Sequence, residues 1–328
     1  MKKSVLFIAI LMSLTSLNYS QWNVLPISTS QYLMDVFFIN PDTGWVVGYN
    51  STIYKTTNGG NSWNQLQVPI TQNLISVYFV DENIGWVTGS QGGIIKTTDG
   101  GSTWANQNSG VPYQIESICF TNSDNGYAVV NDWFGWRYGA ILQTTNGGQN
   151  WIIKTQFDQF GMIDIHFPTS AAGYAVGSNG LIWKTIDAGN SWNYMFFSDI
   201  WLHSVFFIND RVGWIAGGSL SSDFIIKTTN NGNSWFVVRQ TNQNALLSGI
   251  YFIDEENGWA CGDGGTILRT RDGGGSWTKE TTNIQNHLQE FSFANNQGYS
   301  VGNIGTVLKF DIDYQYPLTL IRPNGGEI

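Results

Sequence analysis

The stretch Thr97-Thr98-Asp99-Gly100-Gly101-Ser102-Thr103-Trp104 recurs in altered form along this chain of 328 residues. Its pattern, Thr-x-Asp/Asn-x-Gly-x-x-Trp, is called the turn motif below. It also ends at Trp63, Trp151, Trp192, Trp235 and Trp277. Trp22 extends the series without the motif, so consecutive tryptophans are 41, 41, 47, 41, 43 and 42 residues apart. A near-constant period of this length predicts a repeat architecture.

A second landmark with the same period is a glycine followed by an aromatic residue. It occurs at Gly44-Trp45, Gly85-Trp86, Gly126-Tyr127, Gly173-Tyr174, Gly213-Trp214, Gly258-Trp259 and Gly298-Tyr299. Each of the seven units reads as four short strands, because apolar and polar residues alternate between clusters of turn residues. Four strands in about 42 residues are typical of a β-propeller blade. The sequence therefore predicts an all-β, seven-bladed β-propeller of four-stranded blades.

The two ends of the array complement each other. The last unit, Leu288 to Lys309, has no periodic tryptophan after it, whereas Trp22 has no unit before it. We expect the N-terminal strand at Trp22 to become the outer strand of the last blade. The ring would then be closed, with no unpaired sheet edge at the junction.

The six turn motifs and the glycine-aromatic series resemble the Asp-box (bacterial neuraminidase repeat) propellers. The chain is most similar to the seven-bladed photosystem II stability/assembly factor-like family, over roughly residues 21 to 312. This resemblance implies the propeller fold and places the boxes on an outer rim, away from ligands. It does not imply one function, since such propellers include sialidases, xyloglucanases, sortilin-type receptors and non-catalytic assembly factors. It also implies an arginine-rich partner surface, which this chain lacks.

Three segments are expected. Residues 1–20 read as a secretory signal peptide, because Lys2-Lys3 precedes an apolar run from Val5 to Met12, too short to span a membrane and remain there. Cleavage near Ser20-Gln21 would give a secreted or cell-surface protein. Residues 21–312 form the propeller. Residues 313–328 read as a linker and the possible start of a further extracellular β-sandwich module.

Charge and composition argue against several classes of partner. The chain has 15 basic and 24 acidic residues, a net charge of -9, which disfavours nucleic acid. Cys119 and Cys261 fall in different units, so we expect no disulfide. The histidines His166, His203 and His287 are isolated in sequence and show no metal-ligand spacing. We predict no cofactor, no metal and a monomer.

Residues repeated in every unit are expected to build the ring, whereas residues peculiar to one unit are candidates for ligand binding. The recurring lysines fall in the first class, as long stems that cover apolar strands: Lys55, Lys96, Lys184, Lys227 and Lys309. The second class contains an aromatic insertion in the third unit and the neighbouring connections on the same face. Its candidate binding residues are Asp132, Trp133, Phe134, Trp136, Arg137, Tyr138, Asp158, Phe160, Asp199, Trp201 and Asp223.

Two functions are consistent with this patch. The first is a secreted, non-catalytic binding or scaffold module for a protein or polysaccharide ligand. The alternative is a glycoside hydrolase resembling the xyloglucanase-type propellers, with two of Asp132, Asp158, Asp199 and Asp223 as acid and base. That chemistry needs two carboxyl groups about 5 to 9.5 Å apart. A third reading is structural, with the aromatic residues packing the enlarged loop onto the rim.

Overall fold

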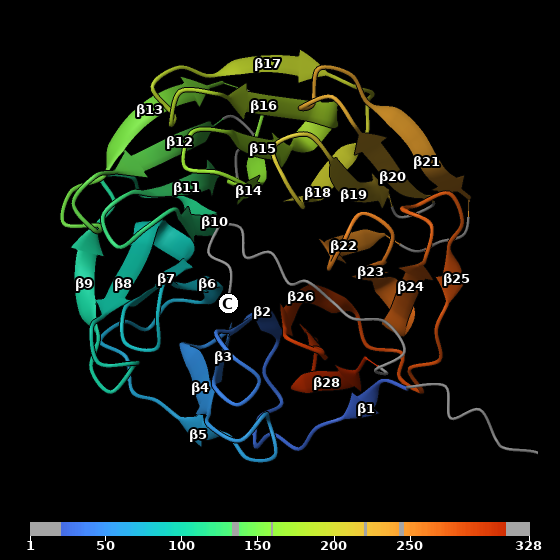
Figure 1. The fold of residues 1–328 in the computed structure, drawn as a ribbon. Helices are drawn as coiled ribbons and strands as arrows, with labels where there is room; N and C mark the ends of the chain where they lie inside the picture. Colours follow the sequence, from blue (N-terminus) through green and yellow to red (C-terminus); the bar gives the residue numbers. More distant parts are fainter. Residues whose placement is uncertain (1–20, 133–137, 159, 220–221, 243–245, 313–328) are drawn as a thin grey trace, which may run out of the picture.

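The computed structural model describes residues 21–132, 138–158, 160–219, 222–242 and 246–312. Seven four-stranded antiparallel sheets surround a common axis (Figure 1). This confirms the predicted seven-bladed β-propeller. Over the residues described, no helix has the length and apolar character needed to cross a bilayer.

The blades are numbered in chain order, and the strands of blades 1 to 6 run from the axis outward (Figure 1). Their bounds are β2 (Leu33–Phe38), β3 (Gly44–Gly48), β4 (Thr52–Thr56) and β5 (Asn64–Gln65) in blade 1; β6 (Leu74–Phe79), β7 (Gly85–Gly89), β8 (Gly93–Thr97) and β9 (Ala105–Asn108) in blade 2; β10 (Gln114–Phe120), β11 (Gly126–Asn131), β12 (Gly139–Thr144) and β13 (Ile152–Phe157) in blade 3; β14 (Met162–His166), β15 (Gly173–Gly177), β16 (Leu181–Thr185) and β17 (Asn193–Phe196) in blade 4; β18 (Trp201–Phe207), β19 (Gly213–Ser219), β20 (Ser222–Thr228) and β21 (Phe236–Thr241) in blade 5; and β22 (Leu247–Phe252), β23 (Gly258–Gly262), β24 (Thr266–Thr270) and β25 (Thr278–Lys279) in blade 6. Short 3-10 turns are η1 (Ser90–Gly92), η2 (Ser178–Gly180) and η3 (Asp263–Gly265).

Blade 7 combines the two ends of the repeat array. It contains β26 (Leu288–Ala294), β27 (Gln297–Gly302), β28 (Thr306–Asp311) and, outermost, β1 (Asn23–Val24). Asn23 lies opposite Lys309, and Val24 lies opposite Leu308. The segment that follows Trp22 therefore supplies the fourth strand of the last sheet. Blades 1 and 7 are neighbours through contacts between β2 and β26.

Aromatic stacking joins each blade to the next. In blade 2 the ring of Phe79 stacks on Trp45 of blade 1, with centroids 3.6 Å apart and planes inclined by 10°. The same contact occurs, with centroid distances of 3.5 to 3.8 Å, at Phe38–Tyr299, Phe120–Trp86, Phe167–Tyr127, Phe207–Tyr174 and Phe252–Trp214. Between blades 6 and 7 the equivalent pair, Phe293–Trp259, is tilted by 34° with centroids 4.8 Å apart. Stacked pairs of this kind add to the burial of large apolar surface.

The glycine of the glycine-aromatic landmark is needed by the same packing. A Cβ added at Gly85 would lie 2.4 Å from the ring of Phe79 in the facing strand. The glycine thus leaves room for the phenylalanine of its own blade. The aromatic residue beside it meets the phenylalanine of the following blade. Each landmark therefore serves two adjacent blade interfaces.

The turn motif forms hydrogen bonds within its own turn, and it also directs a backbone carbonyl group towards the preceding blade. Thr97 Oγ1 donates to Asp99 Oδ1 at 2.8 Å and accepts from the Gly101 amide at 2.8 Å. Gly100 and Gly101 have φ values of +69° and +93°, which favour glycine. The carbonyl of Gly100 then accepts from Trp45 Nε1 at 3.2 Å.

The recurring lysines do more than cover apolar strands. Lys55 Nζ lies 5.0 Å from the centre of the Trp45 ring and donates to the Gly100 carbonyl at 2.9 Å. Lys96 and Lys227 make equivalent contacts with the next turn motif. Each ammonium therefore combines a cation–π contact with an inter-blade hydrogen bond.

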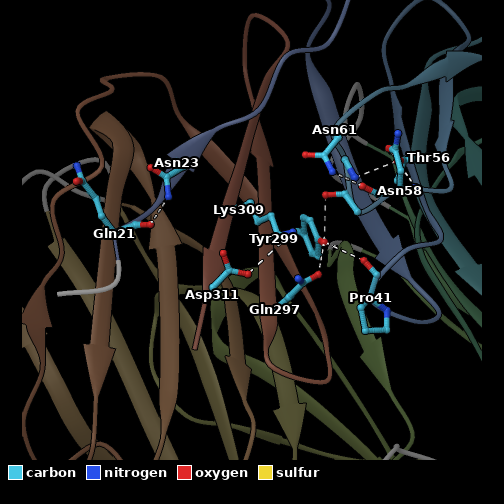
Figure 2. A network of polar contacts seen from close by, with 12 residues as sticks. Gln21, Asn23, Pro41, Thr56, Asn58, Asn61, Gln297, Tyr299, Lys309 and Asp311 are labelled. Carbon is cyan, nitrogen blue, oxygen red and sulfur yellow. Dashed lines mark hydrogen bonds and ion pairs between the residues drawn. The ribbon is translucent and has the colours of Figure 1, made fainter. Parts of the chain in front are cut away.

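At the interface between blades 7 and 1 a tyrosine takes the tryptophan's place. Tyr299 Oη donates to the Pro41 carbonyl at 3.1 Å, and Lys309 Nζ lies 5.6 Å from the centre of the tyrosine ring. Figure 2 shows Tyr299 and Lys309 on one side of this interface and Pro41, with the turn residues Thr56 and Asn58, on the other. The phenol thus bridges the last blade to the first.

The interface between blades 6 and 7 is built differently, because blade 7 has no turn motif. Trp259 Nε1 has no hydrogen-bond partner within the residues described. The guanidinium carbon of Arg269 lies 4.9 Å from the centre of the Trp259 ring. Arg269 Nη1 forms an ion pair with Glu280 Oε1 at 3.5 Å. Glu280 also accepts from Trp22 Nε1 at 2.7 Å. Contacts among Arg269, Glu280 and the buried Trp22 therefore connect blades 6 and 7, where the other blades use the carbonyl group of a turn motif.

We predict that Trp86→Ala lowers the free energy of unfolding by about 3 to 5 kcal/mol, because it empties a fully buried inter-blade position. Chemical denaturation followed by far-UV circular dichroism measures the change. Ile186→Ala, at a side chain 71% exposed, is the control and should change stability by less than about 0.5 kcal/mol. Equal effects of the two variants would contradict the role assigned to the stack.

We also predict that Glu280→Ala lowers the free energy of unfolding by about 2 kcal/mol, since it removes the ion pair with Arg269 and the hydrogen-bond acceptor of Trp22 Nε1. Limited proteolysis should cut the variant faster within residues 21–32, because the outer strand of blade 7 is held less firmly. Lys279→Ala, at the exposed neighbouring position, is the control. Unchanged cleavage in Glu280→Ala would show that the N-terminal strand is retained by other contacts.

Candidate functional site

A cavity of about 860 Å³ lies at the axis of the ring, lined by the first strands of all seven blades. Its wall carries four carboxyl groups, on Asp35, Glu116, Asp164 and Glu290. It also carries three imidazoles, on His166, His203 and His287. None of these residues is among the site residues predicted from sequence, and the three histidines are isolated in the chain. The ring instead brings them to one cavity.

A shared irregularity orients the residues of the wall. In every first strand the pairing register shifts just after the first core residue, for example between Leu33 and Asp35 and between Met162 and Asp164. Such bulges insert a residue and redirect the side chains beside it. The residue after the shift then faces the neighbouring blade along the cavity wall.

The aspartates at this position connect adjacent blades from the inside. Asp35 Oδ2 accepts from Ser76 Oγ at 2.9 Å and from the Val77 amide at 2.8 Å, both in blade 2. Asp164 accepts from Ser117 Oγ in blade 3 and from the Val205 amide in blade 5, each at 2.8 Å. These carboxyl groups are therefore structural links as well as cavity residues.

Burial sets the charge state of the cavity. It raises the pKa of Asp35 from 3.8 to about 7, outweighing the hydrogen bonds from Val77 and Ser76, which lower it. Burial also raises the pKa of Asp164 and of Glu290. It lowers the pKa of His166 to about 4. Since desolvation favours the neutral form of each group, the cavity carries less charge near neutral pH than its composition suggests.

The predicted aromatic patch lies partly outside the described residues. Trp133, Phe134, Trp136 and Arg137 fall outside them. At the base of this loop the Asp132 amide donates to the Tyr138 carbonyl at 3.0 Å. The Tyr138 ring lies 4.6 Å from that of Tyr113. Tyr138 is therefore half-buried against its own blade.

The neighbouring connections bring further predicted residues to the same part of the ring. Phe160 is half-buried and packs edge-on against Phe196, with centroids 5.6 Å apart. Asp158 and Asp199 are exposed. Trp201 is half-buried, and its ring lies 5.9 Å from that of His203.

The predicted binding residue Asp223 makes contacts within blade 5. Its side chain is buried, with Oδ2 accepting from Arg239 Nε at 2.6 Å and Oδ1 bonded to the Thr241 hydroxyl. Arg239 lies in β21, the strand that pairs with the strand of Asp223. A basic residue in a facing strand is a signal that sequence reasoning could have used. Asp223 is therefore a buried structural ion-pair partner of Arg239.

The outer strands of blades 3 to 5 differ from those of the other blades. β13 and β21 each have six residues, whereas β5 and β25 each have two polar residues. Six exposed apolar side chains lie on β13, β17 and β21, and together they are called the apolar edge: Ile152, Ile153, Tyr194, Phe196, Phe236 and Val237. Within the described residues, each of these strands is the outermost of its sheet.

A family model for the photosynthesis system II assembly factor YCF48 matches residues 14–156, 152–246 and 237–311 of this chain. A curated relative is the chloroplastic photosystem II stability/assembly factor HCF136 of Arabidopsis thaliana. The two are 28% identical over 109 residues, which are 30% of this chain and 27% of the relative. The match thus spans about a quarter of that relative's length.

Two solved structures share the architecture. One is YCF48 bound to D1 peptide, with a TM-score of 0.74 and 22% identity over 90% of this chain and 99% of that one. The other is the GH74 xyloglucanase from Xanthomonas campestris, with a TM-score of 0.70 and 11% identity over 91% of this chain and 55% of that one. At these identities the likeness concerns the propeller fold alone.

The raised pKa of Asp35 gives a pH-dependent prediction. Its ionisation in the folded protein is disfavoured up to about pH 7, so its contribution to stability is full below pH 3.8 and is lost as pH rises through 7. Asp35→Asn imitates the protonated acid and removes this loss. Relative to wild type, the variant should therefore gain stability between pH 4 and pH 8, by at most about 4 kcal/mol.

Urea denaturation at matched pH values measures this difference. His166, whose pKa burial lowers to about 4, acts in the opposite sense, so the variant and the wild type are compared at each pH. Asp158→Asn, at an exposed position, is the control and should track the wild type. A constant difference between Asp35→Asn and wild type would show that the carboxyl group titrates normally.

Proposed function

The chain belongs to the family of the photosystem II assembly factor YCF48, and from this membership we propose for it a non-catalytic role, in which the outer surface of the propeller binds a protein partner. The observation that carries the proposal is the apolar edge on blades 3 to 5. This edge adjoins the sequence-predicted patch, since Phe196 belongs to the edge and packs against Phe160.

The apolar edge is suited to an extended peptide segment. An outermost strand offers backbone groups on its free side, and an added strand can pair with them. In natural proteins such edges are usually short or charged, as β5 and β25 are here. β13 and β21 are instead long and carry pairs of exposed apolar residues. Exposed clusters of this kind commonly mark interaction sites.

The charge of the chain indicates the chemistry of the partner. The net charge is -9, and the exposed carboxylates of Asp158 and Asp199 adjoin the connections beside the apolar edge. We therefore propose a partner segment with alternating apolar residues and a positive charge. A relative described as bound to D1 peptide supports a peptide as the kind of ligand.

Export is part of the proposal. The signal-like residues 1–20 would place the encounter with the partner outside the cytoplasm, in secreted or surface-attached form. A polysaccharide ligand and hydrolysis of glycosides receive less support. Of the four acids considered for hydrolysis, Asp223 is held by Arg239, and Asp158 and Asp199 are exposed.

We predict that peptides selected from a phage-displayed random library on the full chain bind the apolar edge. Phe196→Ser combined with Val237→Ser should weaken the selected peptides at least about tenfold, because apolar anchors dominate such interfaces. Fluorescence polarisation with labelled peptides measures the dissociation constant.

The control variant is Ile304→Ser, at an exposed apolar residue of blade 7, which should leave affinity unchanged. Equal affinity of the double variant and the control would place the site elsewhere. Failure to select any peptide, together with retention on a polysaccharide panel, would favour a glycan ligand instead.

A further inference from the structure

Blades 6 and 7 place a hydroxyl, an imidazole and a carboxylate in series, with the hydroxyl and the imidazole at the wall of the axial cavity. Ser248 Oγ lies 3.0 Å from His287 Nε2, and His287 Nδ1 lies 2.5 Å from Asp263 Oδ1. A carboxylate can only accept, so the imidazole proton belongs on Nδ1. Nε2 is then left as the acceptor for the Ser248 hydroxyl.

The three residues come from three different elements. Ser248 lies in β22 at the register shift between Leu247 and Gly249. Asp263 begins the turn η3, and His287 directly precedes β26 of the next blade. They are 15 and 24 residues apart along the chain, so no local motif connects them.

These residues are not part of the sevenfold pattern. The positions equivalent to Ser248 in the other first strands hold Met34, Ile75, Glu116, Ile163, His203 and Gln289. The positions equivalent to His287 hold Tyr32, Asn73, Gln114, Gly161, Trp201 and Leu246. Blade packing does not require a serine and a histidine at these two positions, because the other six blades have different residues there. Residues peculiar to one site of a repeat ring are candidates for function.

The group is held in place and is open to the cavity. Asp263 is fixed from both sides, since its amide donates to the Leu246 carbonyl at 3.0 Å and its Oδ2 accepts from the Leu246 amide at 3.2 Å. Ser248 and His287 are half-buried and line the cavity. The apolar rings of Phe206 and Tyr251 form part of the same wall. A small substrate with an apolar group can therefore reach the hydroxyl.

His203, in the first strand of the adjacent blade 5, is a third residue near Ser248 and His287 in the cavity wall. It lines the same cavity, and burial, with a smaller effect of His287, lowers its pKa to about 4. It is therefore neutral at physiological pH and can donate one N–H bond without carrying a charge. A neutral imidazole is a suitable donor to an oxyanion that develops at a carbonyl group.

We propose that Ser248, His287 and Asp263 form a nucleophilic triad that hydrolyses small carboxylic esters with an apolar acyl group, an activity beyond the proposed partner binding. The geometry meets the requirement of such a triad, in which the nucleophile and base lie within hydrogen-bond reach and a third group orients the base.

Each of the three groups has a separate role in the reaction. Ser248 Oγ bonds to the ester carbonyl carbon while its proton passes to His287 Nε2, and Asp263 stabilises the imidazolium. The bond from carbon to the alcohol oxygen breaks, and His287 returns the proton to that oxygen. Water then attacks the acyl group on Ser248, giving its proton to His287. The bond to Ser248 Oγ breaks, and Oγ is reprotonated, so ester and water yield acid and alcohol.

The test uses the full chain and a rhodamine-tagged fluorophosphonate. Attack by Ser248 Oγ forms an O–P bond and releases fluoride, with the hydroxyl proton taken by His287. We expect one label per chain, mapped by peptide mass spectrometry to Ser248. Ser248→Ala should abolish labelling, and Asp263→Asn should slow it at least about tenfold. Hydrolysis of p-nitrophenyl butyrate should fall in parallel.

The matched control is Ser204→Ala, which removes a serine of the adjacent first strand that lines the same cavity. It should be labelled at the wild-type rate. Thermal unfolding of each variant separates a lost nucleophile from a lost fold. Absence of label on folded wild-type protein at saturating probe, or a label mapped to another residue, would overturn the proposal. In that case the three residues only connect blade 6 to blade 7.

Discussion

The contact on which the ring depends is the stack between a first-strand phenylalanine and the aromatic residue of the preceding blade. It occurs at six of the seven interfaces, with centroids within 3.8 Å, and a tilted pair replaces it between blades 6 and 7. Planar rings at this distance tolerate little change in the angle between blades. The glycine beside each aromatic residue follows from the same packing, because a Cβ there would meet the phenylalanine.

Polar contacts between blades supplement the stack at two distances from the axis of the ring. Farther from the axis, Trp45 and Lys55 both donate to the carbonyl of Gly100 in the next blade. Near the axis, Asp35 accepts from Ser76 and Val77 of the next blade. Buried hydrogen bonds of this kind fix geometry, because leaving any member unpaired costs free energy. Aromatic packing therefore brings blades together, and the polar contacts set their register.

Much of this architecture could be predicted from sequence, because the period, the turn motif and the glycine-aromatic pair are local signals. The cavity could not, since its groups come from first strands about 41 residues apart and meet only in the ring. Ser248, Asp263 and His287 look isolated in sequence for the same reason. The ion pair between Asp223 and Arg239 gives no local signal either, because the two residues lie across a strand pair. The lysines were partly understood, since their stems were recognised but the carbonyl acceptors were not.

The register shift in each first strand separates structural positions from variable ones. The residue just after the shift faces an adjacent blade, and it is polar or glycine in every case: Asp35, Ser76, Ser117, Asp164, Ser204, Gly249 and Glu290. Gly249 fits this rule, because a Cβ there would lie 2.9 Å from Glu290 Oε1. The residue just before it, such as Glu116, His203 or Ser248, lines the cavity and varies freely. The fold thus requires a polar residue or glycine just after the register shift. It leaves the position just before that residue open to other side chains, and Ser248 occupies this position beside His287.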